Sequence, residues 1–186
     1  YGLDMLACYW IAVDESGWAY VYRELFEPGL IISDAAERIN AMTNEAVFAT
    51  LAPPDLWNRR QETGKSVAEI FAEHGIYLTA AKNDRVSGWM DLHEWLKPCV
   101  GMGRKKAAKI RFFENCAHII EDLPALIFDS RDPNDCATEP HEITHGPDAI
   151  RYFVSGRPIP AEARQEAEED SFSYEEQAES FLSYGQ

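Results

Sequence analysis

The sequence predicts an α/β protein in which helices flank a mixed central β-sheet in three layers. Residues 6–26 read as a β-hairpin, because an aromatic-rich apolar run is followed by a turn and a second, alternating run. After the hairpin, short apolar strands alternate with helical patterns, which is typical of α/β proteins. The chain has 186 residues, of which 46% are apolar, enough for one domain with a sizeable core.

The predicted strands are runs of β-branched, aromatic and aliphatic residues bounded by turn residues. The hairpin strands cover residues 6–13 and 18–26, joined by a turn at 14–17 that contains Gly17. Prolines 53 and 54 end the next strand directly. The remaining short strands are expected at residues 47–52, 76–81, 109–113 and 125–128.

The predicted helices follow from apolar stripes at helical spacing and from capping residues at their ends. Ser66 and Glu69 have the spacing of a capping box, which explains the serine structurally. The expected helices cover 33–46 with Ser33 as cap, 67–74 after the capping box, 85–96 with Asp84 as cap, 116–123 until Pro124 breaks it, and a short helix headed by His145 that stops at Gly156.

Composition excludes some kinds of protein. The longest apolar run is far shorter than a membrane-spanning helix needs. The 4 cysteines show no CxxC pairing and are expected to be reduced thiols. Residues 63–66 imitate the end of a phosphate-binding P-loop, but Arg59 stands where that motif requires glycine. Cys136, His141 and His145 have loosely zinc-like spacing, without an evident fourth ligand.

The charge of the chain is unevenly distributed. The formal net charge of −15 argues against a general nucleic-acid binder. Residues 162–179, however, contain 8 acidic and 1 basic residue, and we expect a disordered or loosely helical acidic tail there. Residues 59–111 contain 11 Lys or Arg and 6 Asp or Glu. This basic middle segment could hold a phosphate backbone, or it could simply be a solvated face.

The segment from His145 to Tyr152 carries the strongest chemical signal. Gly146 can cap a helix and Pro147 fits its first position, which places Asp148 in the first turn, where the helix dipole favours a carboxylate. Residues three apart share a helix face, so His145 and Asp148 can address one point. A carboxylate held this way suits a hard cation such as Mg²⁺ or Mn²⁺. The alternative is an ordinary helix start.

Two further aspartates could complete a metal site. Asp55 follows a short strand, where functional side chains collect in α/β sheets, and Arg59 and Arg60 come soon after it. Asp4 lies just before the first hairpin strand. With Asp148 they offer three carboxylates, which can hold two divalent ions for phosphodiester cleavage. The basic turn formed by Arg104, Lys105 and Lys106 could grip duplex phosphates. Asp55 could equally be a simple turn residue.

In several ordered blocks the sequence resembles the C-terminal nuclease domain of the terminase large subunit of tailed bacteriophages. The resemblance extends to about Pro158 and rests on residues 10–14, 20–24, 52–60, 66–73, 83–89, 113–116 and 144–153. It implies a ribonuclease-H-like fold and metal-dependent cleavage of concatemeric viral double-stranded DNA during genome packaging. It also implies that two Mg²⁺ or Mn²⁺ ions act as cofactors and that the protein is located in the cytoplasm of the infected bacterial host.

The resemblance assigns residues to roles. The family's closing His-x-x-Asp falls on His145 and Asp148, and its second acid is best matched by Asp55, two residues beyond the usual place, which Pro53 occupies. The family's first acid precedes an aromatic residue and glycine. Here Tyr1 and Gly2 open the chain, so Asp4 becomes a loop acid near the site. We therefore expect a nuclease domain over residues 1–158 that lacks its first strand, followed by the acidic tail over 159–186.

The implied partners are double-stranded DNA, an upstream ATPase motor domain of the same protein, the terminase small subunit and the portal protein, with no membrane. Arg59, Arg60, Arg104, Lys105 and Lys106 would hold the DNA backbone. Two alternatives stay open. One is an inert DNA-docking or assembly module of the packaging motor. The other is a different ribonuclease-H-like nuclease, such as a junction resolvase.

Overall fold

The computed structural model describes residues 1–186 except 3, 62–63, 101–105 and 157–186. Within these ranges the protein is an α/β structure with a mixed sheet and five α-helices, as predicted. The predicted acidic tail and the end of the predicted domain lie outside the described residues. The elements in chain order are β1 (Leu6–Val13), β2 (Ala19–Glu27), α1 (Ile32–Met42), β3 (Thr50–Ala52), the 3₁₀ helix η1 (Pro54–Trp57), α2 (Val67–Glu73), β4 (Leu78–Ala80), α3 (Arg85–Leu96), β5 (Ile110–Phe112), α4 (Ala117–Ala125), the 3₁₀ helix η2 (His141–Ile143) and α5 (His145–Ser155).

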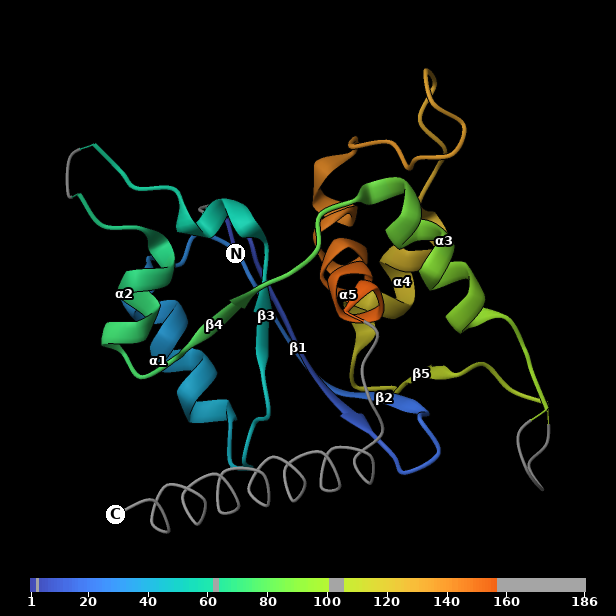
Figure 1. Ribbon diagram of the computed structural model, residues 1–186, viewed down its shortest axis with the longest axis horizontal. Coiled ribbons are helices and arrows are strands. Elements are labelled where there is room, and N and C mark those ends of the chain that lie inside the picture. The colour runs from blue at the N-terminus through green and yellow to red at the C-terminus, as the bar shows by residue number, and fades with distance from the viewer. Residues whose placement is uncertain (3, 62–63, 101–105, 157–186) are drawn as a thin grey trace, which may run out of the picture.

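The predicted hairpin forms the centre of the molecule (Figure 1). Strands β1 and β2 pair antiparallel, from Leu6 opposite Glu27 to Val13 opposite Ala19. Asp14 fixes the turn, since its Oδ1 accepts hydrogen bonds from the backbone N–H groups of residues 16 and 18. Strand β5 then adds to β2 in parallel, so the three-stranded sheet is mixed in the order β1-β2-β5.

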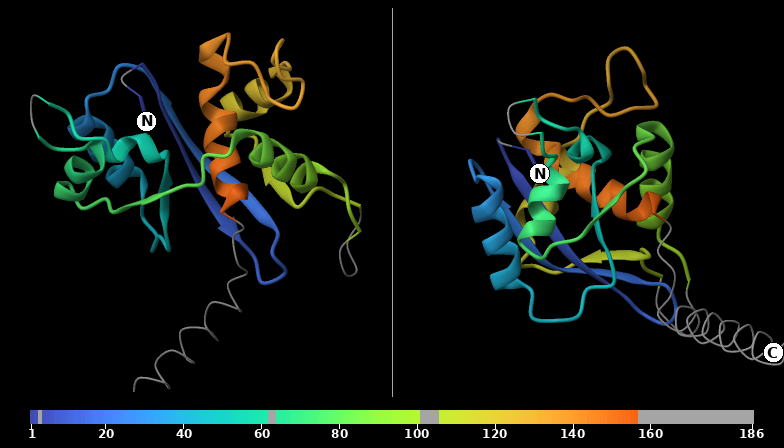
Figure 2. Two further views of the ribbon diagram at one scale, coloured as in Figure 1. Left: turned by 45° about the horizontal axis from the view of Figure 1, so that its top comes forward. Right: turned by 60° about the vertical axis from the view of Figure 1, so that its left-hand side comes forward.

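Helices cover the hairpin on two sides, which is the layered arrangement that the sequence predicts. Figures 1 and 2 show α1 and α2 on one side of β1 and β2, with α3, α4 and α5 on the other. Successive strand residues point to opposite faces. Strand β1 accordingly packs Leu6, Cys8 and Trp10 with the first group of helices, and Tyr9, Ile11 and Val13 with the second.

A second, smaller sheet lies beside the first. Strands β3 and β4 pair parallel, with Thr50 opposite Leu78 and Ala52 opposite Ala80. Strand β3 pairs only with β4, and β1 only with β2, among the described strands. Every residue of β1 and of β3 lines one cleft of about 1370 Å³, here called the central cleft. Each strand therefore has an edge without a β partner, and the central cleft separates the two sheets.

Several predicted boundaries are wrong by small amounts. Helix α1 starts at Ile32, one residue before Ser33, and no side chain caps it. Pro124 lies inside α4 instead of breaking it, because a proline in the last turn disturbs few helical hydrogen bonds. Residues 125–128 form no strand and contribute only an isolated bridge between Phe128 and Cys136.

Two local predictions are confirmed at helix starts. Ser66 and Glu69 form the reciprocal capping box of α2. Asp84 caps α3, because its carboxylate accepts a hydrogen bond of 3.0 Å from the backbone N–H of Ser87. Within the described ranges, no helix combines the length and the apolar character that crossing a membrane requires.

Candidate metal centre

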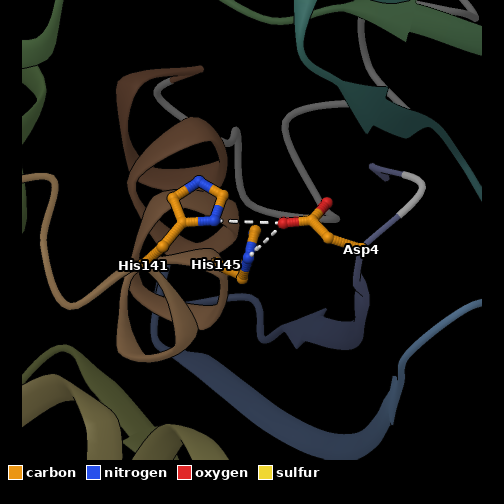
Figure 3. A group of neighbouring side chains, drawn as sticks. All are labelled: Asp4, His141 and His145. Atoms are coloured by element: carbon orange, nitrogen blue, oxygen red, sulfur yellow. Dashed lines mark ion pairs between the residues drawn. The ribbon is translucent and has the colours of Figure 1, made fainter.

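Asp4, His141 and His145 come together in the lining of the central cleft. Oδ2 of Asp4 lies 3.0 Å from Nδ1 of His141 and 3.2 Å from Nε2 of His145 (Figure 3). The centroids of the two imidazole rings are 4.4 Å apart, and the ring planes make an angle of 76°. One donor atom from each residue lies within 4.8 Å of the others, so the three side chains form a group that could hold a metal ion.

The two histidines are positioned by the start of α5. His141 opens the 3₁₀ helix η2, and its backbone carbonyl accepts hydrogen bonds from both N–H and Oγ1 of Thr144. His145 follows as the first residue of α5. The helix therefore begins one residue before Gly146, and the predicted roles of Gly146 as cap and Pro147 as first helical residue are wrong. Thr144 is the residue at the cap position, although its side chain does not cap.

Asp4 comes from the opposite end of the described chain. It lies in the turn that leads into β1, where the N–H of Gly2 donates to the carbonyl of Met5 at 2.9 Å. A β-carbon at position 2 would overlap Oδ1 of Asp4. The absence of a side chain at Gly2 therefore leaves the space that the Asp4 carboxylate occupies.

The protonation of the group suits cation binding. Partial burial raises the pKa of Asp4, but the backbone N–H of Asp4 and the neighbouring His145 and His141 lower it more, so the net pKa is below its usual value. The pKa of His145 is lowered, chiefly because burial disfavours the imidazolium, and His141 lowers it further against the opposing effect of Asp4. A carboxylate beside a neutral imidazole is the ligand state that metals require.

Asp148, the predicted metal ligand on α5, is paired with two arginines. Its Oδ1 accepts a hydrogen bond of 2.9 Å from Nε of Arg151, whose side chain is completely buried. Nη1 of Arg85 lies 3.4 Å from the same carboxylate. Arg85 also donates to both carboxylate oxygens of Asp135. Asp148 thus neutralises a guanidinium network between α3 and α5 while it lines the central cleft.

Asp55 lies where the sequence places it, just beyond β3. It is an exposed residue of the 3₁₀ helix η1 and lines the central cleft together with Asp4, His145 and Asp148. The pKa of Tyr152 is raised mainly by burial, and the negative charges of Asp148 and Asp55 raise it further. Both carboxylates therefore raise the pKa of the same tyrosine in the central cleft. Neither of them belongs to the three-residue metal group.

The predicted DNA-binding residues fall in different places. Arg59 and Arg60 line a hollow of about 290 Å³ that shares Tyr1 and Asp55 with the central cleft. Arg59 also pairs with Glu69 at 3.2 Å in an exposed ion pair. Lys106 is exposed and does not line the central cleft. Arg104 and Lys105 lie outside the described residues.

Sequence reasoning missed His141 as a neighbour of Asp4. Its four-residue spacing from His145 is the signal that could have found it, because about one helical turn separates such residues, and here that turn runs from η2 into the start of α5. The zinc-like pattern did include His141, but the metal group contains Asp4 in place of Cys136. The partnership of Asp148 with Arg85 spans 63 residues, and no local pattern in the sequence reveals it.

Comparisons with known proteins identify no relative of this chain. No protein-family description matches the sequence, and neither a curated protein nor a solved structure is significantly similar to it. The function is therefore inferred from the residues of the central cleft.

Proposed function

We propose that this protein is a metal-dependent endonuclease domain of the terminase type, which cleaves concatemeric viral double-stranded DNA during genome packaging. The observation that carries the proposal is the convergence of distant ligand residues on one cleft. Asp4 precedes β1, Asp55 follows β3, and His145 and Asp148 lie on α5, yet all four line the central cleft. Clustered carboxylates and imidazoles in a cleft are what phosphodiester hydrolysis with metal ions needs.

The arrangement of the two sheets supports the part of the proposal that assigns the domain a ribonuclease-H-like fold. Among the described strands, β1 and β3 each have an edge without a β partner, and the residues of both strands line the central cleft. A further strand laid between these edges would join the two sheets into one mixed sheet, with Asp55 at the end of a central strand.

The residues of the cleft fit a divalent cation by their donor chemistry. Asp4 and Asp55 have exposed carboxylates, and His145 presents Nε2 to Asp4. Mg²⁺ or Mn²⁺ held by Asp4, Asp55 and Asp148 would supply a Lewis acid for activating water and stabilising the leaving oxygen. His145 would assist proton transfer or ligate an ion. A second ion at Asp148 would compete with Arg85 and Arg151 for the carboxylate.

The remaining parts of the proposal concern the surroundings of the site. Arg59 and Arg60, beside Asp55, would contact DNA phosphates, together with Arg104, Lys105 and Lys106. An ATPase motor domain of the same protein, the small subunit and the portal protein would be partners, in the cytoplasm of the infected bacterium.

One observation favours the second candidate, an inert docking or assembly module. The carboxylate of Asp148 is already neutralised by two guanidinium groups, as in a purely structural ion-pair network. In that case the protein would bind DNA and packaging partners without cutting.

Nicking of supercoiled plasmid by the full-length protein in Mn²⁺ separates the two candidates. Asp55 is the sharpest test, because its exposed side chain is not part of the arginine network. We expect Asp55→Asn to reduce nicking at least about 100-fold, whereas the exposed helical residue Glu121, changed to Gln, serves as control and leaves nicking unchanged. Absence of nicking by the wild-type protein, or full nicking by Asp55→Asn, would contradict the proposal.

A further inference from the structure

We propose that Asp4, His141 and His145 form a binding site for a single first-row transition-metal ion, which prefers Zn²⁺ or Mn²⁺ to Mg²⁺. The role of such an ion in cleavage rests on the proposed nuclease function, but its binding does not. Binding is therefore what the test measures.

The separations of Oδ2 of Asp4 from the two imidazole nitrogens suit a common ion. Ligands held about 2.1 Å from one ion lie roughly 3 to 3.5 Å from each other. Oδ2 of Asp4 already lies 3.0 Å from Nδ1 of His141 and 3.2 Å from Nε2 of His145. The donor atoms of the group all lie within 4.8 Å of one another, so small rotations of the side chains would place them as three ligands around an ion.

The chemistry of the donors determines the kind of ion. Mg²⁺ prefers oxygen ligands in a near-ideal octahedron, whereas imidazole nitrogen suits Zn²⁺ and other transition metals. Two of the three donors here are imidazole nitrogens. Two histidines and one carboxylate also leave coordination positions for water or substrate, as in catalytic metal sites. In this arrangement His145 acts as a ligand and not as a proton carrier.

The surroundings of the group hold the ligands in place and leave them accessible. His145 is anchored at the start of α5 with only 18% of its side chain exposed, whereas Asp4 and His141 are about half exposed. Thr144 ties the backbone of His141 to the same helix start. Gly2 leaves room for the Asp4 carboxylate, since a β-carbon there would overlap its Oδ1. The start of α5 thus positions both histidines, while Asp4 and His141 stay accessible from solvent.

Calorimetric titration of the full-length protein with Zn²⁺, Mn²⁺ and Mg²⁺ tests the inference. We expect one ion to bind per chain, with affinity falling in the order Zn²⁺, Mn²⁺, Mg²⁺. Loss of a residue that only supports a metal ligand typically weakens metal binding about 10–100-fold. Because His141 is a proposed ligand itself, His141→Ala should weaken Zn²⁺ binding by at least this much. His93→Ala is the matched control, because His93 is an exposed helical histidine outside the group, and this variant should bind as the wild type does.

The absorption spectrum of bound Co²⁺, measured in two variants, provides a second test if one of the substitutions unfolds the protein. Ligand-field bands should appear on Co²⁺ binding and disappear both in His141→Ala and in Asp4→Ala, which removes the carboxylate of the group. Equal Zn²⁺ affinity in wild type and His141→Ala would overturn the inference, as would Mg²⁺ binding as tight as Zn²⁺.

The same measurements distinguish this inference from the proposed function. If Zn²⁺ binding depends on His141 but no DNA is nicked in any metal, the metal site stands and the nuclease proposal fails. If nicking in Mg²⁺ survives His141→Ala while Zn²⁺ binding does not depend on His141, the nuclease proposal stands and this inference fails.

Discussion

Nε of Arg151 donates a hydrogen bond of 2.9 Å to Oδ1 of Asp148, one turn earlier on α5, and the arginine side chain is completely buried. The residue that the sequence marks as a metal ligand is therefore also the counterion of a buried cation. Nη2 of the same guanidinium donates to Oδ1 of Asn83, and the guanidinium carbon lies over the ring of Trp89, 5.4 Å from its centroid. Removing the carboxylate would affect folding as well as any metal chemistry.

The variant Asp148→Asn should lower the free energy of unfolding by about 2–4 kcal/mol. The physical reason is that a buried guanidinium would lose its charged partner, and an uncompensated buried charge is costly. Urea unfolding, followed by tryptophan fluorescence, measures the change against the exposed control Glu121→Gln. A loss below about 0.5 kcal/mol, the usual range for surface changes, would show that Arg151 does not depend on Asp148.

The start of α5 is fixed by a close approach to β1. A β-carbon at Gly146 would lie 2.7 Å from the hydroxyl oxygen of Tyr9. We therefore expect Gly146→Ala to reduce stability by about 1–3 kcal/mol, through displacement of the helix that carries His145. Because Tyr9→Phe removes the colliding oxygen, the double variant should recover most of the loss. A double-variant cycle by thermal unfolding measures this coupling, and strictly additive effects would contradict the contact.

Stability should fall in acid partly through Asp135. Partial burial raises the pKa of its carboxyl, but the hydrogen bond from Arg85, then those from the N–H of Cys136 and from Trp89, lower it more, so the net pKa is below the usual value of 3.8. A carboxyl with a lowered folded-state pKa stabilises the protein above its unfolded-state pKa, and this contribution is lost as the pH falls through the lower folded-state value.

Urea unfolding of the wild type and of Asp135→Asn at pH 6, 4 and 3 checks this contribution. The wild type should be the more stable protein at pH 6, and the difference between the two should shrink below pH 4, because the variant has no carboxyl to protonate. A difference that stays constant from pH 6 to pH 3 would mean that Asp135 does not contribute through its charge.

Local signals in the sequence predict much of the fold. The hairpin follows from alternation and from the turn at Asp14, and α2 and α3 follow from their capping residues. Each of these signals involves neighbouring residues, so a single sequence suffices to read it. The predicted start of α1 at Ser33 is wrong because Ser33 has only the residue type of a cap, whereas Ile32 packs in the core and begins the helix one residue earlier.

The candidate site was only partly predictable for the same reason. The spacing of His145 and Asp148 is local, and both residues do line the central cleft. The contact of Asp4 with His141, and the pairing of Asp148 with Arg85, join residues far apart in the chain. Such contacts depend on how β1 and α3 pack against α5, which local periodicity does not encode.

The Mn²⁺ dependence of plasmid nicking by the full-length protein, compared between wild type and Asp4→Asn, tests the central claim most directly. A divalent ion held by Asp4 in the central cleft predicts that the variant needs at least about tenfold more Mn²⁺ for half-maximal nicking, since an amide is a weaker ligand than a carboxylate. The same Mn²⁺ requirement and the same rate in both proteins would contradict it.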